Sequence, residues 1–460
     1  MKNRFHATRT SICPVCLKQV PADHVEDDQG VFLEKLCPEH GPYRSRIAAD
    51  YDWFSGLGHY TAFTVKPEIR QTRIEKGCPY DCGECGAHRQ KSVFFLFEIT
   101  SRCNLNCPIC LGRPNGKRKD ITPDEMAGMI QTVLDYAGQP PILTMGGGEP
   151  TLHPDFFNLV HMAKASGIAD IWVYTNGVKI SEDETLARRL VDENLYIVLQ
   201  WDGFDDAIYE TLRGRKLLSS KHLALSHLKE AGARIGICPT ITAGVNDHNL
   251  GDLFQFFKKD PSIVMLDIAV MAFVGKGSGF ETGRESRITA QDILIGLEQQ
   301  TGGEIRVSDF SPISFSNPEC LQIAYLFALP DGGFIPLKRF LEPQDFDALI
   351  MNTPLIELNA EKEDVFRDVI NRLWAEGKEN DDTRLGLASL KHIVKNLFDK
   401  PLDLVEFTQR SRDLVKTVLV HAYMDGLNFD LGRTKMCISR TVQPDGRLIP
   451  TCAYNTVHRQ

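Results

Sequence analysis

The sequence lacks any long hydrophobic run. No stretch of roughly 18 apolar residues occurs along its 460 positions, and the first residues, MKNRFHATRTS, do not include the apolar segment of a secretory signal peptide. Internal repeats and low-complexity tracts are absent as well. We therefore expect a cytoplasmic protein that could still associate peripherally with a membrane surface.

An excess of positive charge is also missing. The formal net charge is −9, whereas binding along a nucleic-acid backbone needs a basic face, so we expect no nucleic-acid partner. With 42% hydrophobic and 25% charged residues, the composition is that of an ordinary globular protein. The length predicts two or three domains.

The chain is rich, in contrast, in cysteine. It contains 13 cysteines, and nearly all of them are clustered. Cysteines in a reducing compartment rarely form disulfides, and clustered ones most often bind metal. Metal centres are therefore the first functional expectation.

Residues 1–92 are predicted to form a cysteine-rich, metal-binding domain. This region has the composition of loops, carries six of the cysteines and shows few periodic apolar segments. A region with so small a core would not be stable alone. Metal binding would supply the missing free energy of folding.

Residues 93–285 alternate between strand and helix patterns. The run VFFLFEIT, residues 93–100, is typical of a buried parallel strand, and the next helix has Thr122 as N-cap, Pro123 at its first position and Glu125 three residues after the cap. Six such repeats over roughly 180 residues predict a parallel sheet with right-handed crossovers. They are too few for a closed eightfold barrel, so we expect an α/β fold with a partial (β/α)6 barrel of the TIM type.

Residues 286–460 are predicted to form a mainly helical domain that carries auxiliary-cluster cysteines. Segments such as AEKEDVFRDVINRLWAEG and TRLGLASLKHIVKNLF show the helical pattern. The cysteines of this region stand far apart in the chain.

Three cysteines, Cys103, Cys107 and Cys110, lie in the stretch RCNLNCPICLGRPNG, directly after the first predicted barrel strand. Three thiolates can hold three irons of a four-iron, four-sulfur cluster and leave the fourth iron open, as a catalytic metal site requires. The alternative is a zinc knuckle with a distant fourth ligand. In spacing and position the loop resembles the signature of the radical SAM superfamily.

That resemblance implies a reaction. In this superfamily the open iron binds S-adenosylmethionine, and an electron from the reduced cluster cleaves it to a 5′-deoxyadenosyl radical. The radical removes hydrogen from an unactivated carbon. A low-potential electron donor, flavodoxin or ferredoxin, is the implied partner.

A second motif supports the resemblance. The stretch MGGGEP ends the second predicted strand, and glycines there let the backbone approach a ligand closely. In the family this motif binds the methionyl amino group. Two later strand ends, YTNG and QWDG, resemble further parts of the pocket, although they are equally typical of turns chosen for backbone geometry. The implied cofactor-binding residues are Gly146, Gly147, Gly148, Glu149, Asn176 and Asp202.

The remaining cysteines form three further candidate metal groups. CPVC and CPEHG have the spacing of a mononuclear zinc or iron site, with a purely structural zinc as the alternative to a redox iron. A second C-x3-C-x2-C triplet precedes the first strand and suits an auxiliary iron–sulfur cluster. Three late cysteines suit a second one, whereas Cys238 is expected in the core. The groups are Cys13, Cys16, Cys37 and His40; Cys78, Cys82 and Cys85; and Cys320, Cys437 and Cys452.

The order of these motifs resembles one branch of the superfamily, the tetraether lipid synthase-like group. The resemblance implies a rubredoxin-like iron site, one or two auxiliary clusters, and carbon–carbon bond formation on a lipid or other apolar chain. Some members of the group are linked to methylation of pterins, so a methylase of a pterin-like or other small metabolite is the first alternative. The second alternative is a non-catalytic iron–sulfur electron carrier.

Overall fold

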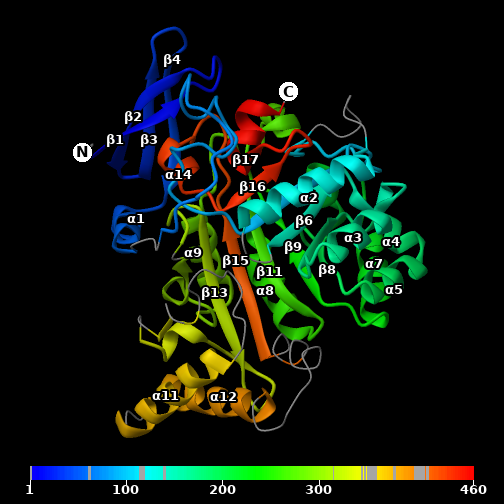
Figure 1. The fold of residues 1–460 in the computed structure, drawn as a ribbon. Coiled ribbons are helices and arrows are strands. Elements are labelled where there is room, and N and C mark those ends of the chain that lie inside the picture. The colour runs from blue at the N-terminus through cyan, green and yellow to red at the C-terminus, as the bar shows by residue number, and fades with distance from the viewer. Residues whose placement is uncertain are drawn as a thin grey trace.

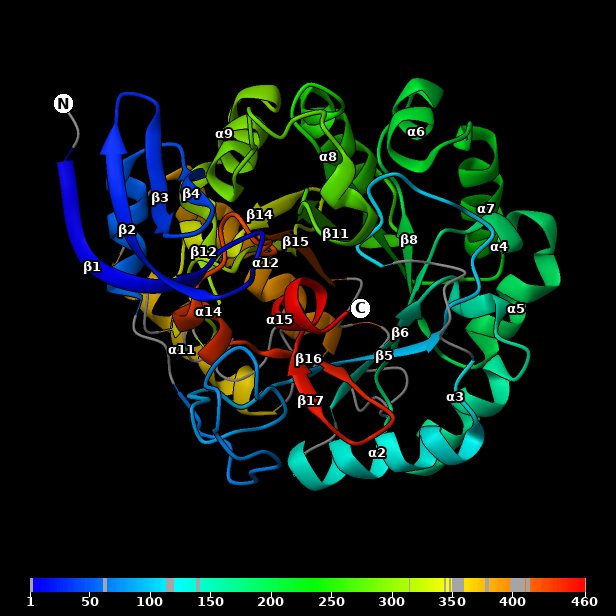
Figure 2. The ribbon, with the colours of Figure 1, turned by 90° about the horizontal axis from the view of Figure 1, so that it is seen from above.

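The computed structural model describes residues 3–60, 64–112, 120–137, 141–313, 315–342, 345–346, 349, 360–376, 380–397, 410 and 414–459. Residues 113–119, the end of the three-cysteine stretch, lie outside the described residues. The chain forms a small antiparallel sheet followed by a large, mostly parallel sheet that curves into an open barrel (Figures 1 and 2).

The amino-terminal region is a four-stranded antiparallel sheet, so the expectation of a loop-rich segment was wrong for its first half. The buried Val20 and Ala22 alternate with the exposed Gln19 and Pro21 at the strand period, but the apolar side chains are small and few, which hides the pattern. Gly30, with a φ of +127°, makes the turn between the second and third strands. The elements are β1 (Asn3–Ile12), β2 (Gln19–Asp27), β3 (Gly30–Cys37), β4 (Gly41–Ala48) and α1 (Tyr51–Gly56).

Six parallel strands make the barrel, which confirms the predicted fold class. They lie side by side in chain order, and Figure 2 shows the helices around the outside of the curved sheet. The strands are β5 (Phe94–Thr100), β6 (Ile142–Gly147), β7 (Ile171–Thr175), β8 (Tyr196–Gln200), β9 (Ile235–Cys238) and β11 (Ile263–Val270), with the short β10 (Thr240–Ile241) beside β11.

The helices of the barrel cover the outer face of these strands with apolar side chains. The first begins with the predicted capping box, since Thr122 N donates to Glu125 Oε2 (2.7 Å) and Glu125 N donates to Thr122 Oγ1 (3.2 Å). They are α2 (Pro123–Ala137), α3 (Phe156–Ala165), α4 (Val178–Glu182), α5 (Glu184–Asp192), α6 (Asp206–Arg213), α7 (Leu218–Glu230), α8 (Leu250–Lys259) and α9 (Ala290–Gln300).

The carboxyl-terminal region contributes strands as well as helices, which corrects the expectation of a mainly helical domain. β15 (Val415–His421) pairs in parallel with β11, and β16 (Ser439–Val442) pairs in parallel with β5, so both barrel edges are extended. The runs LQIAYLFA and VKTVLVH are short and apolar, as strands covered on both faces must be. The large sheet contains strands from both sides of the predicted domain boundary at residues 285–286. The domain boundaries therefore stay a prediction.

The other elements of this region are β12 (Ser311–Pro312), β13 (Leu321–Ala328), β14 (Phe334–Pro336), α11 (Ala360–Glu376), α12 (Asp381–Leu397), α14 (Leu431–Lys435), β17 (Leu448–Pro450) and α15 (Thr451–Ala453). α11 and α12 lie at the end of β13 and β15 far from the amino-terminal sheet (Figure 1). The two predicted helical segments of this region match α11 and α12.

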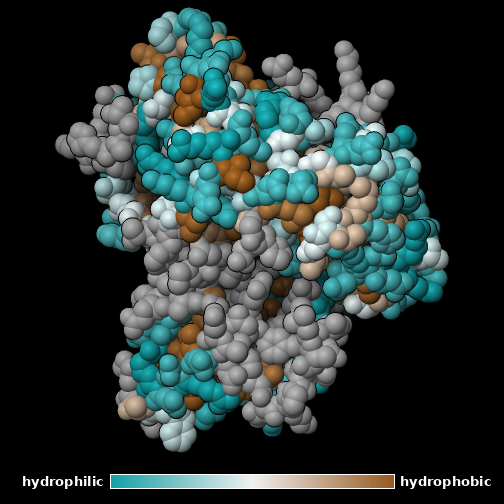
Figure 3. All heavy atoms as spheres, in the orientation of Figure 1, coloured by the Kyte–Doolittle hydropathy of each residue, from teal (hydrophilic) through white to brown (hydrophobic). Residues whose placement is uncertain are grey.

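Hydrophilic side chains cover most of the described barrel surface on the face drawn in Figure 3. Among the described residues, no helix combines the length and the apolar character that crossing a membrane requires.

Candidate active site and metal centres

A cavity of about 430 Å³ lies inside the barrel and is lined by its strands, the three-cysteine loop and residues near the carboxyl end. Two groups of cysteines that are far apart in the sequence face it together. One is the loop triplet after β5, and the other is the late triplet of the carboxyl-terminal region. These lining cysteines are Cys103, Cys107, Cys110, Cys320, Cys437 and Cys452.

The glycine motif at the end of β6 is joined to the start of the cysteine loop by backbone hydrogen bonds. Gly148 N donates to Thr100 O and Glu149 N donates to Arg102 O, both at 2.7 Å. A Cβ atom on Gly148 would lie 2.1 Å from Arg102 O, so this approach requires glycine. The contact fixes the cysteine loop beside the glycine-lined wall of the cavity.

The Glu149 carboxylate is buried and fully used within the chain. Its Oε1 accepts hydrogen bonds from the hydroxyls of Thr151 and Thr175, each at 2.7 Å, and its Oε2 accepts one from Asn176 N at 2.7 Å. The carboxylate therefore ties the end of β6 to the end of β7. A ligand at this wall would meet the backbone of residues 146–148 rather than a free carboxylate.

Asn176 lies where the sequence predicts, on the cavity wall next to the cysteine loop. Its Nδ2 donates to Asn104 Oδ1 (2.8 Å) and lies 4.0 Å from Cys103 Sγ. Lys221 Nζ donates to Asn176 O (2.5 Å) from behind, and burial lowers the pKa of Lys221 to about 7. Asn176 thus connects the cysteine loop to the end of β7.

Asp202 is placed differently from the expectation of direct cofactor binding. It is fully buried behind Arg213, whose Nε and Nη2 donate to its two oxygens at 2.7 Å each. Arg213, not Asp202, lines the cavity. Burial lowers the pKa of Arg213, but the neighbouring Asp202 charge outweighs this and raises it, so the guanidinium stays charged.

A second arginine, Arg459, lines the same cavity. It forms an ion pair with Glu98 of β5. Burial raises the pKa of the Cys110 thiol, and the positive charges of Arg213 and Arg459 oppose that rise. Sequence reasoning assigned no role to Arg459, because only the fold brings it to the loop.

Three thiols beside a cavity with a glycine-lined wall and two arginines suit an iron–sulfur cluster with one iron open to a ligand. Burial raises the pKa of Cys103 to about 11, so the free thiol is protonated and would deprotonate on binding iron. The charges of Arg213 and Arg459 would offset the negative charge of the thiolates. The residues therefore fit the cluster that the spacing predicts.

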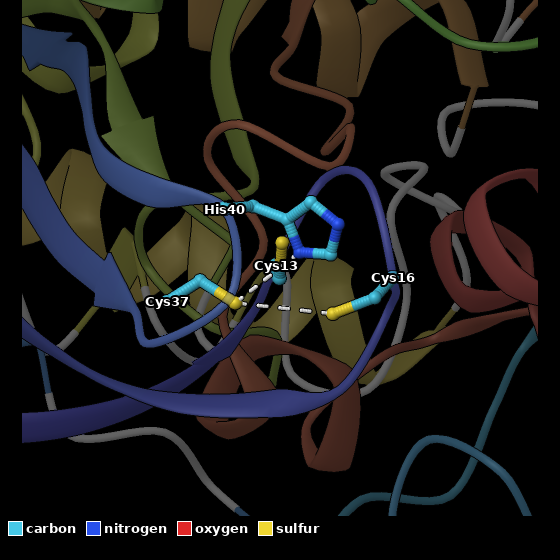
Figure 4. A group of neighbouring side chains, drawn as sticks. All are labelled: Cys13, Cys16, Cys37 and His40. Carbon is cyan, nitrogen blue, oxygen red and sulfur yellow. Dashed lines mark hydrogen bonds between the residues drawn. The ribbon is translucent and has the colours of Figure 1, made fainter.

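The predicted amino-terminal metal site is assembled. Cys13 and Cys16 follow β1, and Cys37 and His40 lie at the turn from β3 to β4 (Figure 4). Their four ligand atoms lie within 4.8 Å of one another, with 3.9 Å between Cys16 Sγ and Cys37 Sγ and 3.5 Å between Cys37 Sγ and His40 Nδ1. Three sulfurs and one imidazole nitrogen at such spacing suit a tetrahedral zinc or iron ion.

The thiol of Cys13 is prepared for a metal by the loop itself. Burial raises its pKa, but backbone N–H groups of Cys16 and Val15 more than compensate, and the pKa falls to about 7. Val15 N lies 3.4 Å from the sulfur. A thiolate is therefore accessible near neutral pH.

Cys78, Cys82 and Cys85 lie between α1 and β5 and do not appear among the described residues that line the barrel cavity. Cys82 and Cys85 are buried, and burial raises the pKa of Cys78 to about 11. A buried network anchors this segment to β16, with Arg440 Nη2 3.3 Å from Glu84 Oε2 and His88 Nδ1 2.9 Å from Glu84 Oε1.

The late cysteines are close enough to influence one another. Burial and the neighbouring Cys437 raise the pKa of Cys452 to about 12, and Arg433 Nε donates to Cys320 Sγ at 3.3 Å. Cys238, expected in the core, is only partly buried and lines the cavity. The cluster-binding roles of this triplet and of the Cys78 triplet stay predictions.

A partial barrel with a three-cysteine loop after its first strand and a glycine wall after its second defines an iron–sulfur enzyme of the radical type. Residues 97–257 match the family model of the Radical SAM superfamily, and residues 5–49 match the HMPTM N-terminal zinc ribbon domain. The chain is a radical SAM enzyme that uses S-adenosylmethionine with a 4Fe-4S cluster and has a mononuclear metal site. The electron-carrier alternative is thereby set aside, and the rubredoxin-like interpretation of the amino-terminal site gains no support.

The chain is similar along nearly its whole length to the 7,8-dihydro-6-hydroxymethylpterin dimethyltransferase of Methanocaldococcus jannaschii, with 29% identity over 98% of this chain and 93% of that protein. It is 25% identical to the GTP 3′,8-cyclase of Staphylococcus saprophyticus over 44% of this chain and 60% of that protein. The solved structure of Streptococcus suis SuiB bound to S-adenosylmethionine is 18% identical, with a TM-score of 0.38. That match covers 46% of this chain, which spans about half, 47%, of the SuiB chain.

Proposed function

We propose that this enzyme methylates a reduced pterin that carries a hydroxymethyl group. The observation that carries the proposal is the similarity to the pterin dimethyltransferase, which covers 98% of this chain and 93% of that protein. This supports the methylase alternative better than the lipid-coupling hypothesis. Both the identity of the substrate and the number of methyl groups that are transferred are part of what we propose.

The chain's own residues would act in binding and shielding. Cys103, Cys107 and Cys110 would hold the cluster, which, when bound, supplies the electron that cleaves S-adenosylmethionine to the 5′-deoxyadenosyl radical. The backbone of residues 146–148 would receive the methionyl amino group, and Arg213, fixed by Asp202, is positioned to pair with a carboxylate.

The cavity itself would protect the radical. Its wall is mostly apolar, with Trp172, Val198 and Leu419 among the lining residues. An apolar enclosure excludes water and holds the substrate carbon next to the radical. Cys320, Cys437 and Cys452 face the same space, so an auxiliary cluster there would lie beside the substrate. A flavodoxin or ferredoxin is the proposed reductant.

The apolar wall also favours the second candidate, carbon–carbon bond formation on a lipid chain. A hydrocarbon needs no hydrogen-bonding partner, and most of this wall offers none. The lipid hypothesis depends on this observation and on the motif resemblance, whereas the methylase proposal has a relative that covers almost the whole chain.

One experiment separates the candidates. The anaerobic, cluster-loaded enzyme is incubated with S-adenosylmethionine, a strong reductant and deuterium-labelled substrates of each class, and the products are analysed by mass spectrometry. A pterin that gains methyl groups supports the proposal, and S-adenosylmethionine with a labelled methyl group shows whether that group comes from it. Coupled lipid chains with an unchanged pterin would reject the proposal in favour of the second candidate.

A further inference from the structure

One part of the cavity wall is polar and is not used by the cysteine loop or the glycine motif. Tyr174 of β7 and His421 of β15 line the cavity, and Asp267 of β11 lies behind them, 3% exposed. The Tyr174 hydroxyl donates to Asp267 Oδ2 (2.9 Å), and His421 Nε2 lies 3.1 Å from Asp267 Oδ1. Three strands of the barrel thus bring one carboxylate, one phenol and one imidazole together.

The sheet fixes this arrangement. β11 and β15 run in parallel with Ala269 opposite His421, and Asp267 lies two residues before Ala269, on the same face of β11. Tyr174 reaches Asp267 from β7, which β9 and β8 separate from β11 in the curved sheet. Tyr174, Asp267 and His421 therefore come from three different strands and meet inside the barrel.

Its hydrogen-bonding capacity is not exhausted within the chain. Asp267 Oδ1 and His421 Nε2 are close but poorly aligned, and neither atom has a well-aligned hydrogen-bond partner among the described residues, although the Cys238 thiol also interacts with the Asp267 carboxylate. A buried carboxylate oxygen without a partner is costly, so its retention calls for an explanation. The His421 side chain is 23% exposed, so part of the ring faces the cavity while Nε2 faces Asp267.

The direction of the protons on Tyr174 and His421 determines which kind of ligand these side chains can bind. Because Asp267 Oδ1 lies 3.1 Å from His421 Nε2, the carboxylate favours the tautomer with its proton on Nε2, and Nδ1 of His421 is then left as a hydrogen-bond acceptor. Tyr174 already donates its proton to Asp267, so its oxygen also offers a lone pair. Both cavity-facing groups therefore present acceptors, which match a ligand edge rich in N–H or O–H donors.

We infer that Tyr174, His421 and Asp267 form a recognition subsite for the donor-bearing edge of a flat, polar heterocycle. This inference rests on the proposed function, since a reduced pterin carries amino, ring N–H and hydroxymethyl donors. Tyr174 and His421 contact the ligand, and Asp267 is a positioning residue that orients both. A hydrocarbon chain has no donors and gains nothing from this subsite.

The test measures binding separately from catalysis. The full-length, cluster-loaded protein with S-adenosylmethionine is titrated with 7,8-dihydro-6-hydroxymethylpterin under anaerobic conditions, as wild type and as Tyr174→Phe and His421→Phe. Each variant is expected to weaken binding roughly tenfold, because each removes one acceptor from a desolvated site.

Matched controls exclude a general structural effect. Tyr136→Phe removes another buried tyrosine hydroxyl, which accepts from Ser92 N outside the cavity, and His161→Gln removes an exposed imidazole on α3. Both controls should bind the pterin like the wild type. Because Tyr174→Phe deletes a single oxygen atom, it tests the subsite even where the histidine variant folds poorly.

The outcomes separate the two proposals. Pterin binding and methylation that are unchanged in both cavity variants would overturn the subsite and leave the proposed function standing. A wild-type protein that binds no pterin but binds a long-chain lipid, with equal affinity in the variants, would overturn both. Selective loss of pterin binding in the two variants supports the subsite.

Discussion

Asp202, which follows β8, holds Arg213 through two parallel hydrogen bonds of 2.7 Å and thereby aims a buried guanidinium at the cavity from the end of α6. Thr240 N donates to the same carboxylate at 3.0 Å, which keeps it in place. Asp202, the acid that the sequence marks as a pocket residue, thus supports Arg213, and it is Arg213 that lines the cavity. Two-pronged arginine–carboxylate pairs fix both position and orientation.

We expect Asp202→Asn to weaken S-adenosylmethionine cleavage at least tenfold and to destabilise the fold by roughly 3–5 kcal/mol, because removal of one partner leaves a buried charge unpaired. The measurements are 5′-deoxyadenosine formation and denaturant unfolding. Glu184→Gln, which breaks an exposed ion pair with Arg188, is the control and should change neither. Normal cleavage in Asp202→Asn would mean that Arg213 does not serve the cofactor.

The glycine wall gives a second prediction. In Gly148→Ala the new Cβ would lie 2.1 Å from Arg102 O, so the cysteine loop must move away from β6. We expect loss of S-adenosylmethionine binding, measured by equilibrium dialysis, together with a lower iron content. Gly128→Ala on the exposed face of α2 meets no atom within 4 Å and should leave binding intact while stabilising the helix by about 0.5–1 kcal/mol. Equal behaviour of the two variants would refute the close-approach argument.

Local patterns in the sequence were enough to predict the barrel. Apolar runs such as residues 93–100 and the Thr122–Glu125 capping box depend on neighbours in the chain, and β5 and α2 formed where expected. The metal quartet was predictable for the same reason, since each half is a short motif.

Long-range pairings escaped sequence reasoning. Nothing local to VKTVLVH indicates that β15 pairs with β11, and therefore His421 could not be placed beside Asp267. Arg459 could not be placed either, because its ion-pair partner Glu98 lies on β5, far away in the sequence. The late cysteines were marked as a metal group, but only the fold reveals that they face the same cavity as the loop cysteines.

Substitution by alanine tests which cysteine triplet holds the catalytic cluster. Replacing Cys103, Cys107 and Cys110 together by Ala should abolish reductive cleavage of S-adenosylmethionine, because backbone hydrogen bonds fix the loop that carries them against the glycine wall. The amino-terminal metal should remain bound, as measured by elemental analysis of the purified protein. If cleavage persisted, Cys78, Cys82 and Cys85 would be the next candidates for the catalytic cluster.

His24 gives the amino-terminal sheet a defined acid sensitivity. Burial, with a contribution from Arg9, lowers the pKa of His24 from 6.5 to about 4, so between these pH values the unfolded chain binds a proton that the folded chain does not. The stability is fully present above pH 6.5 and falls by about 3 kcal/mol as the pH drops towards 4. His24→Gln should unfold with a weaker pH dependence in denaturant titrations at pH 7 and pH 4.5. His161→Gln, which removes an exposed imidazole, should keep the wild-type difference.

Removal of the mononuclear metal should loosen the amino-terminal sheet without opening the barrel. The core beside the site is small and consists of Val20 together with the ligand cysteines and Tyr43, so metal ligation contributes much of the local stability. We expect Cys16→Ser, or treatment with a strong chelator, to speed backbone hydrogen exchange across residues 13–48 while β6, β7 and β8 exchange as before. Cys238→Ser, a change at a cavity thiol outside the four ligands, is the control and should leave that segment protected. Protection of residues 13–48 in the metal-free protein would mean that strand pairing alone holds the sheet, and the four convergent ligand atoms would then have to serve something other than its folding.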